Sequence, residues 1–271
     1  MHLLGDPLEL TRLPVGDGKF STTTPQRGVV FVCAAPRDDI GGAFRAGPWI
    51  RSDATFDFTA KAVVDGNVNW QSVFTQTLEG NVSRMSGNGL PSHPTGVYPI
   101  ASSDDAYQYD RNPNRIAAQR LEWNLSVDPL VAAQPTCTPG GAVGVMLSGA
   151  VIYNALDAGG RDALAHETQD ACQGHPDPRG SYHYHSLSSC AQDTKTGQSK
   201  LLGYALDGFG IYGPRDEFGR VLTNADLDEC HGRTAAVEWR GRRVVMYHYV
   251  ATLEYPYTVG CFRGTPIRRA R

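Results

Sequence analysis

The stretch Tyr182-His183-Tyr184-His185 alternates two tyrosines with two histidines. Side chains on an extended strand point to its two faces in turn, so His183 and His185 share one face and both tyrosines lie on the other. Two imidazoles that converge on one face provide half of a metal site. The stretch therefore predicts a β-strand with a metal-binding face.

A second stretch, Tyr247-His248-Tyr249, repeats this pattern and has Val250 where another histidine would fall. A neighbouring strand that carries His248 would supply a third nitrogen ligand. Three imidazoles suit one catalytic zinc or copper ion with an open coordination position. We therefore expect His183, His185 and His248 to share one coordination sphere, with nitrogen–metal distances of about 2.0 to 2.2 Å.

Composition and charge restrict the classes of partner. The 271 residues include 30 Gly, 17 Pro and 12 Tyr, which is typical of a turn-rich globular protein. A net charge of -3 gives no long-range attraction to nucleic acid or to an anionic membrane. Because no apolar stretch reaches the roughly 18 to 20 residues of a membrane span, we expect a soluble protein without a membrane partner.

Short apolar runs separated by Gly, Pro, Asn and Asp indicate many short strands. These runs lie at 29–33, 121–127, 143–147, 151–153, 201–206, 210–212, 237–239 and 244–250. The alternation from Phe56 to Val73 around Asp65-Gly66-Asn67 predicts a hairpin, and one helix is expected over 161–171. The predicted fold is mainly β with one or two short helices (α+β is an alternative), as an antiparallel sheet sandwich or a barrel-like sheet held by disulfides.

We expect one domain over residues 1–271, with N-terminal strands in 28–75 packed on the rest of the chain. The polar stretch 83–94 is the best candidate for a boundary loop, because it is rich in Gly, Ser, Asn and Pro.

Six cysteines stand at positions 33, 137, 172, 190, 230 and 261 without any Cys-x-x-Cys pair. An even number spread in this way indicates disulfides, although buried free cysteines are an alternative. Fifteen pairings are possible. Cys172 with Cys190 and Cys230 with Cys261 would close loops around the two Tyr-His stretches, each stabilising by about 3 kcal/mol in the chain-entropy model. Cys33 and Cys137 would then form the third pair.

Oxidised cysteines imply an exported protein, secreted or periplasmic. The stretch 1–13 has no basic region followed by an apolar run of signal-peptide length, so we expect that a signal peptide has been removed.

Several long motifs occur in one order along the chain, at 170–185, 202–214, 225–232 and 254–264. Together with 144–167 they resemble the YHYH domain family, over roughly 91–264. The resemblance implies an exported, disulfide-bearing protein and no assigned reaction. The chain departs from the family pattern at Val250, where the second Tyr-His stretch usually continues to another histidine.

Other polar residues near these motifs are candidates for catalytic roles. His175 and His231 lie in loops and could act as a further ligand or a proton shuttle. Asp207 ends an apolar strand, where a carboxylate either binds its own turn or orients an imidazole as a general base. The hydroxyls of Tyr182 and Tyr184 could donate to a developing oxyanion.

We expect a metal-dependent enzyme, hydrolytic with zinc, that acts on a small molecule or a glycan; the oligomeric state stays open. One alternative is a non-catalytic metal-binding protein with a fourth ligand such as His175. Another is a metal-free domain that processes or binds glycans through Tyr and His, and the Tyr/His layer could also be purely structural. The acidic residues Asp226, Asp228 and Glu229 could bind calcium or cap a turn.

Overall fold

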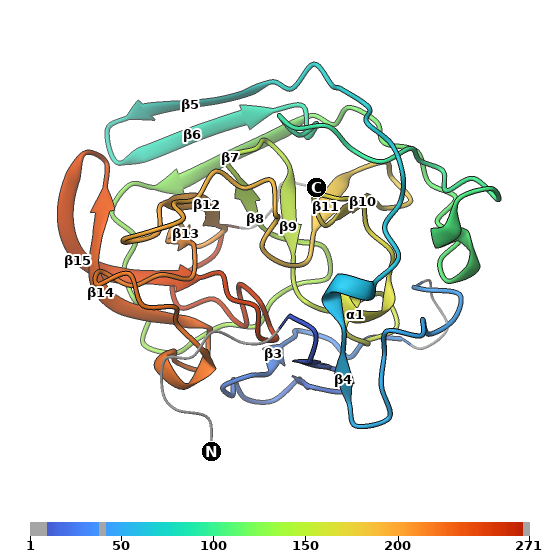
Figure 1. Cartoon of the computed structure of the whole chain (residues 1–271). Helices are drawn as coiled ribbons and strands as arrows, with labels where there is room; N and C mark the ends of the chain where they lie inside the picture. The colour runs from blue at the N-terminus through green and yellow to red at the C-terminus, as the bar shows by residue number, and fades with distance from the viewer. Residues whose placement is uncertain (1–9, 38–41, 268–271) are drawn as a thin grey trace.

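The computed structural model describes residues 10–37 and 42–267; most of the stretch 1–13 considered above lies outside this part. The described chain is mostly β, without a long helix, as predicted. Its largest sheet has eight strands and lies in the middle of the molecule (Figure 1). The strands are β8 (Ala142–Met146), β9 (Val151–Tyr153), β10 (Gly174–Pro176), β11 (Tyr182–Tyr184), β12 (Leu201–Ala205), β13 (Gly210–Tyr212), β14 (Gly232–Trp239) and β15 (Arg242–Val250).

The strand order in this sheet is β10-β11-β9-β8-β12-β13-β15-β14. Two pairings, β9 with β11 and β13 with β15, are parallel, and the other neighbours are antiparallel. The strands predicted at 143–147, 151–153, 201–206, 210–212 and 244–250 are all present within one or two residues of their expected ends. The two Tyr-His stretches lie in β11 and β15, as their alternation predicted.

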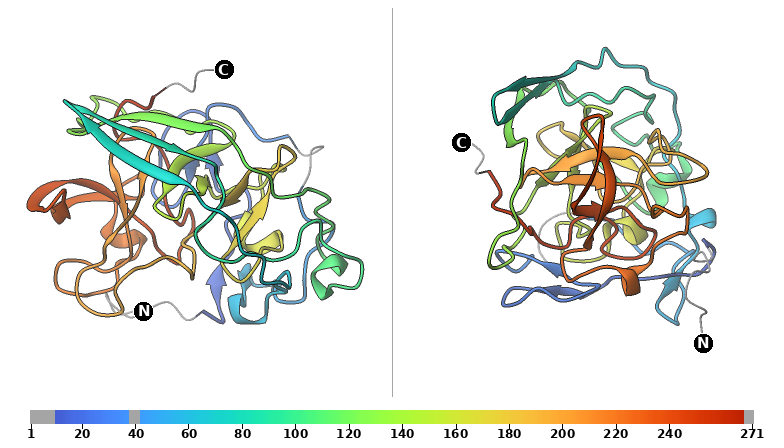
Figure 2. Two further views of the ribbon diagram at one scale, coloured as in Figure 1. Left: turned by 90° about the horizontal axis from the view of Figure 1, so that it is seen from above. Right: turned by 90° about the vertical axis from the view of Figure 1, so that its left-hand side faces the viewer.

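A three-stranded antiparallel sheet covers one side of the large sheet (Figures 1 and 2). It consists of β5 (Phe74–Glu79), β6 (Val82–Gly87) and β7 (Leu121–Ser126). Met85, Trp123 and Leu125 point into the core shared with the large sheet. The prediction of a loop over 83–94 is therefore wrong at its start. The polar residues of β6 include Arg84 and Ser86 on its exposed face, which made a half-buried strand look like a loop.

The described residues of the N-terminal part form only two-residue strands: β1 (Leu13–Pro14), β2 (Phe20–Ser21), β3 (Val30–Phe31) and β4 (Thr55–Phe56). Trp49 and Phe56 pack in one buried cluster with Leu164 and Tyr257, so this part is joined to the rest by a common core. The predicted hairpin from Phe56 to Val73 is absent. The Asp57 side chain accepts hydrogen bonds from the backbone amides of Thr59 and Ala60 and starts the 3-10 helix η1 (Phe58–Ala60) instead.

Helices are short. The helix predicted over 161–171 is only α1 (Ala163–His166), which Asp162 caps through two backbone amides. Glu167 takes an extended conformation and ends it. The other helical turns, η2 (Asp105–Gln108) and η3 (Asn224–Asp226), are single turns. Within the described residues, no helix is long and apolar enough to cross a membrane.

All six cysteines are paired, as Cys33–Cys137, Cys172–Cys190 and Cys230–Cys261, which confirms the predicted connectivity. The last two close loops around β11 and β15. We expect thiol titration of the denatured, unreduced protein to find essentially no free thiol. Two or more reactive groups per chain would contradict the pairing.

Candidate metal centre

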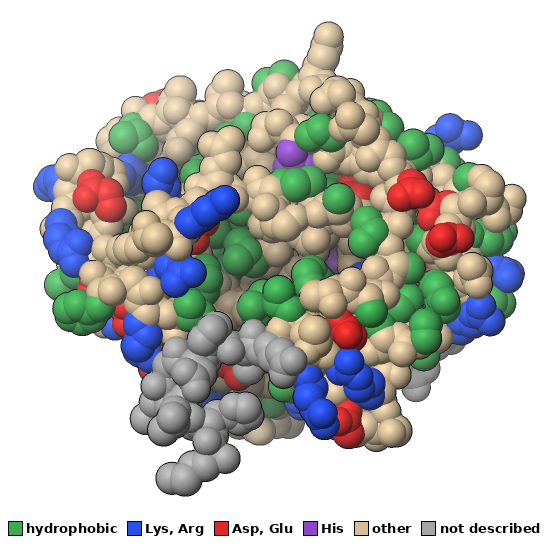
Figure 3. Space-filling view, viewed as in Figure 1, with side chains coloured by type: hydrophobic (Ala, Val, Ile, Leu, Met, Phe, Trp, Pro, Cys, Tyr) green, Lys and Arg blue, Asp and Glu red, His purple; other side chains and the backbone are tan. Residues whose placement is uncertain are grey.

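Strand β11 lies between β10 and β9, and His183 in this strand and His185 directly after it point to the same side. In the antiparallel pair of β10 and β11, His175 stands directly opposite His183. Ligand nitrogens of His175, His183 and His185 all lie within 4.8 Å of one another. The strand pairing thus adds His175, expected only as a further ligand or proton shuttle, to the predicted pair. On the face shown in Figure 3, histidine appears only as small patches.

Hydrogen bonds fix which ring nitrogen of His183 and of His185 carries the proton. His183 Nδ1 lies 3.1 Å from the Ser181 carbonyl, and His185 Nδ1 lies 2.6 Å from the Asn154 carbonyl. A carbonyl oxygen only accepts, so both Nδ1 atoms donate. In the neutral rings both Nε2 atoms then carry lone pairs, and these two atoms lie 3.1 Å apart. Two lone pairs so close repel each other unless a cation lies between them.

A proton is a poor candidate for that cation. Burial lowers the pKa of His183 to about 3 and that of His185 to about 4, because an imidazolium loses its hydration there. A metal ion fits better, because two nitrogens on one tetrahedral zinc are about 3.3 Å apart. Ligand histidines also commonly donate their other ring N–H to a carbonyl, as both do here.

His175 and Glu167 complete the cluster with polar atoms that lack partners. Neither ring nitrogen of His175 makes a hydrogen bond, and Glu167 Oε2 makes none, although all three atoms are buried. Glu167 Oε2 lies 3.5 Å from the Nε2 atoms of both His175 and His185. Burial raises the pKa of Glu167 well above its ordinary value and lowers that of His175 well below. Buried polar atoms without partners are rare, and a bound cation would satisfy Glu167 Oε2 and one ring nitrogen of His175.

Glu167 was not predicted as a site residue, because the expected helix over 161–171 gave it a surface position. It reaches the cluster because α1 stops at His166. The next residues are then anchored: the Thr168 backbone amide donates to Asp110, and Lys61 donates to the Gln169 side chain. The sequence contains no pattern that marks Glu167 as different from a helix-surface carboxylate.

Tyr153, on the neighbouring strand β9, packs against the histidine side chains. Its ring stacks on His183 with 3.9 Å between centroids and 22° between planes. Its hydroxyl donates to Asp177, which also accepts from the backbone amides of Arg179 and Ser181. The ring of His183 is therefore fixed by stacking on one side and by its carbonyl partner at Nδ1.

A cavity of about 950 Å³ reaches the cluster and is lined by Glu167 and all three histidines. This volume falls in the range of pockets for small molecules. The lining also includes Phe44, Arg111 and Arg179. The Arg111 guanidinium lies over the Phe44 ring at 3.7 Å from its centroid. The arrangement joins a buried ligand set to a space large enough for a substrate.

His248 does not belong to this cluster, so the prediction of a shared coordination sphere needs correction. Strands β9, β8, β12 and β13 separate β11 from β15 in the sheet. Five interstrand spacings of about 4.8 Å place His248 roughly 24 Å away along the sheet. Its ring contacts Tyr212 instead. The alternating pattern predicts which side chains share one face of a strand, but it does not predict which strands lie next to that strand in the sheet.

Asp207 and His231 also lie away from the cavity lining. Asp207 Oδ2 accepts hydrogen bonds from the Tyr249 hydroxyl at 2.6 Å and the Gly264 amide at 2.8 Å. His231 Nε2 is 3.0 Å from the Thr252 hydroxyl and belongs to a buried turn. Both residues serve the core in this structure, which removes the geometric basis for the predicted roles as base or proton shuttle.

Tyr182 and Tyr184 lie on the opposite face of β11 from the histidines. The Tyr182 hydroxyl donates to Asp170, and the Tyr184 hydroxyl contacts Ser148 and His93. Both rings are buried. The structure therefore gives them a packing role and places their hydroxyls out of reach of the cavity, contrary to the predicted donation to an oxyanion.

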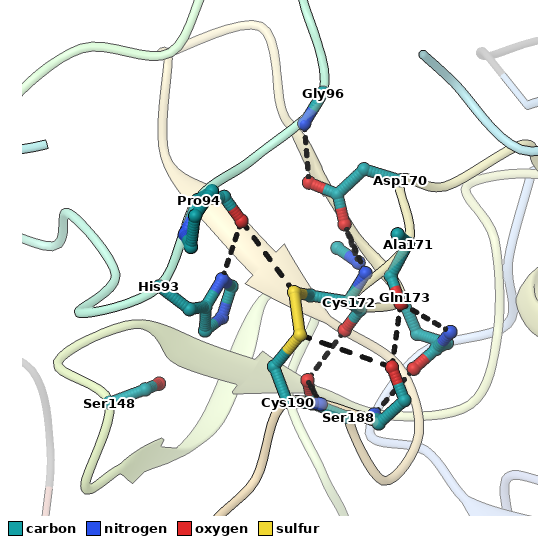
Figure 4. Close-up of a disulfide and its surroundings, with 12 residues drawn as sticks. His93, Pro94, Gly96, Ser148, Asp170, Ala171, Cys172, Gln173, Ser188 and Cys190 are labelled. Atoms are coloured by element: carbon teal, nitrogen blue, oxygen red, sulfur yellow. Dashed lines mark hydrogen bonds between the residues drawn. A yellow bond between two sulfur atoms is a disulfide. The ribbon is translucent and has the colours of Figure 1, made fainter. Parts of the chain in front are cut away.

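A second group of potential ligands in the described residues consists of His93, Cys172 and Cys190. Its two sulfur atoms form a disulfide, so no thiolate is available (Figure 4). His93 Nδ1 lies 2.8 Å from the Pro94 carbonyl. This group is a disulfide with a neighbouring histidine.

Two of the three acidic residues considered for calcium, Asp226 and Asp228, already have protein partners. Asp226 accepts from the Thr223 amide and from Arg220. Asp228 accepts from the amides of Cys230 and Gly232. These contacts favour the turn-capping alternative over a calcium site.

Comparison with known proteins gives one match. Neither the search of curated proteins nor the search of solved structures finds a similar protein. Residues 122–219 match the family model described as YHYH protein, a range that contains Glu167, His175, His183 and His185 and ends before β14. The match is narrower than the predicted 91–264 and confirms the resemblance to the YHYH family over residues 122–219.

Proposed function

We propose that this chain is an exported metal-dependent enzyme, with His175, His183 and His185 as ligands of one zinc or copper ion. The observation that carries the proposal is that Nε2 of His183 and Nε2 of His185 lie 3.1 Å apart, while the Nδ1 atom of each ring is bonded to a carbonyl. The three disulfides support export, because such bonds persist in oxidising compartments.

Hydrolysis is the reaction that we propose for the zinc form. A zinc ion with three protein ligands lowers the pKa of bound water to about 7 and supplies a nucleophile at neutral pH. Glu167 lies beside His175 and His185 with a buried oxygen that has no hydrogen-bond partner, so it is the residue placed to accept the proton. The cavity of about 950 Å³ would hold a small molecule or a sugar unit.

A non-catalytic metal-binding protein is the second candidate, because the ligands are strongly buried. His175 is 3% exposed and His183 and His185 are each 4% exposed. If Glu167 ligates the ion as well, the coordination is closed and no position remains for water. The role of Glu167 therefore separates an enzyme from a carrier.

Metal content tests the proposal as a whole. We expect elemental analysis of protein purified without an affinity tag to find about one zinc or copper per chain, removed by a chelator and restored by adding the metal. Hydrolysis of a panel of chromogenic esters, phosphate esters and glycosides should be lost when the metal is removed and return when it is added back. Protein that stays free of metal, even after incubation with zinc and with copper, would sink the proposal and favour the metal-free alternatives.

Glu167→Gln separates the enzyme from the carrier. For the enzyme we expect hydrolysis to fall by about 10²- to 10⁴-fold, because a general base is lost, while one metal per chain remains. The measurement is metal stoichiometry together with the rate on the best substrate of the panel. A variant that loses its metal instead identifies Glu167 as the fourth ligand and favours the carrier.

A further inference from the structure

The two halves of the large sheet share one order of elements. Residues 142–185 form the hairpin β8–β9, the helix α1 and the strands β10 and β11. Residues 201–250 form the hairpin β12–β13, the turn η3 and the strands β14 and β15. In both, the last strand pairs in parallel with the second strand of the hairpin. The sheet order is symmetric about the β8–β12 pair.

The turn after each hairpin repeats in detail. Asp157 binds Arg161 in the first half, and Asp216 binds Arg220 in the second, both as ion pairs four residues apart. A glycine with positive φ precedes each arginine. Such agreement in charge, spacing and backbone conformation indicates a duplicated unit.

The tyrosine face repeats as well. Tyr182 donates to Asp170, and Tyr247 donates to Asp228. The second tyrosine of each stretch bonds to a residue of its hairpin turn, Tyr184 to Ser148 and Tyr249 to Asp207. A disulfide closes a loop around each stretch, and its first cysteine lies two residues after the aspartate that binds the first tyrosine.

Strand register defines which residues occupy the ligand positions in the second half. His175 stands opposite His183 in the first half, and Arg233 stands opposite His248 in the second. Val250, two residues after His248, corresponds to His185. Arg233 and Val250 therefore replace two of the three ligands, and His248 is retained.

The retained histidine has the orientation of its counterpart. His248 Nδ1 lies 3.2 Å from the carbonyl of Met246, two residues earlier, just as His183 Nδ1 lies 3.1 Å from that of Ser181. Nδ1 donates in both, and Nε2 is left with a lone pair. The surroundings differ, because Arg233 pairs with Glu217 at 3.4 Å and Val250 packs with Leu222 and Leu227.

We infer that the second half carries a latent metal site. His248 occupies one ligand position of this site, and Arg233 and Val250 occupy the other two. Replacing Arg233 and Val250 by histidine will create a second three-imidazole site for a divalent transition-metal ion. The duplication stands on the structure alone. Only the step that assigns metal binding to the three ligand positions rests on the proposed function. The test therefore uses variants in which the first site is disabled.

The experiment measures metal stoichiometry by elemental analysis after incubation with zinc and desalting. We expect one ion in the wild type, two in R233H/V250H, none in H183A and one in H183A/R233H/V250H. Adding H248A to the last variant should remove that ion again. A folded H183A/R233H/V250H that binds no zinc overturns the inference. A wild type without zinc, together with a triple variant that binds one ion through His248, defeats the proposed function alone.

Val250 is buried in an apolar cluster, so V250H is the change that endangers folding. R233H alone avoids it, because the Arg233 side chain is 22% exposed at the edge of the sheet. Two imidazoles at directly opposed positions on neighbouring strands have Cβ atoms about 5 Å apart and can chelate copper. In the H183A background, R233H should bind Cu²⁺ at least tenfold more tightly than R233H/H248A. Equal affinities would overturn the inference.

Discussion

Replacing His183 or His185 by alanine is expected to abolish metal binding and hydrolysis while leaving the β-fold intact. Each residue supplies one of three nitrogen ligands, and the loss of a ligand should exceed the roughly 10- to 100-fold that removal of an outer partner costs. The fold should survive, because each variant leaves one buried carbonyl without its donor, about 1 to 3 kcal/mol, while the three disulfides remain. Metal stoichiometry and the thermal midpoint should be measured on the same samples.

His248→Ala is the matched control, since it removes a buried histidine of the same pattern from the other half of the sheet. We expect it to keep one metal per chain. If His183 and His185 instead form a structural layer, H183A and H185A will lower the thermal midpoint as much as H248A does and leave the metal content unchanged. That outcome would contradict the account of the site.

Replacing Asp207 by alanine is expected to destabilise the fold by roughly 3 to 5 kcal/mol. Asp207 is buried and accepts from the Tyr249 hydroxyl and from the amides of Phe209 and Gly264. Each buried donor left without a partner costs about 1 to 3 kcal/mol. Denaturant unfolding measures the change. The metal content of the folded fraction should stay at one ion per chain, because Asp207 is remote from the cluster.

Two milder variants complete this test. D207N keeps one oxygen as an acceptor for Tyr249 and Gly264 and should cost much less than D207A. S148A removes the corresponding contact in the first half, but Tyr184 keeps His93 as a partner, so about 1 kcal/mol is expected. Normal stability of D207A with reduced hydrolysis would instead favour the role of Asp207 as a catalytic base.

The sequence predicted those features that depend on local pattern. Alternation in the Tyr-His stretch gave the strand β11 and its histidine face, and the positions of the cysteines around both stretches gave the disulfides. The hairpin signal at Asp65-Gly66-Asn67 was misleading, because the Asp57 side chain starts a 3-10 helix before the strand can continue. A single side chain that binds the backbone outweighed the apolar alternation.

The composition of the site could be predicted only in part, because a ligand set depends on strand neighbours. His175 joins the cluster through the β10–β11 register, and His248 is excluded by four intervening strands. Glu167 depends on the early end of α1. The duplication explains the wrong prediction for His248. The same local pattern occurs once in each half of the sheet, so the two Tyr-His stretches lie in β11 and β15, which are not neighbours.

Crystallographic anomalous scattering at the zinc and copper absorption edges tests the central claim most directly. We expect a peak about 2.0 to 2.2 Å from Nε2 of His183, from Nε2 of His185 and from one ring nitrogen of His175. Crystals grown from protein incubated with zinc or with copper that show no peak there, and a hydrogen-bonded water or direct contact between the imidazoles instead, would contradict it.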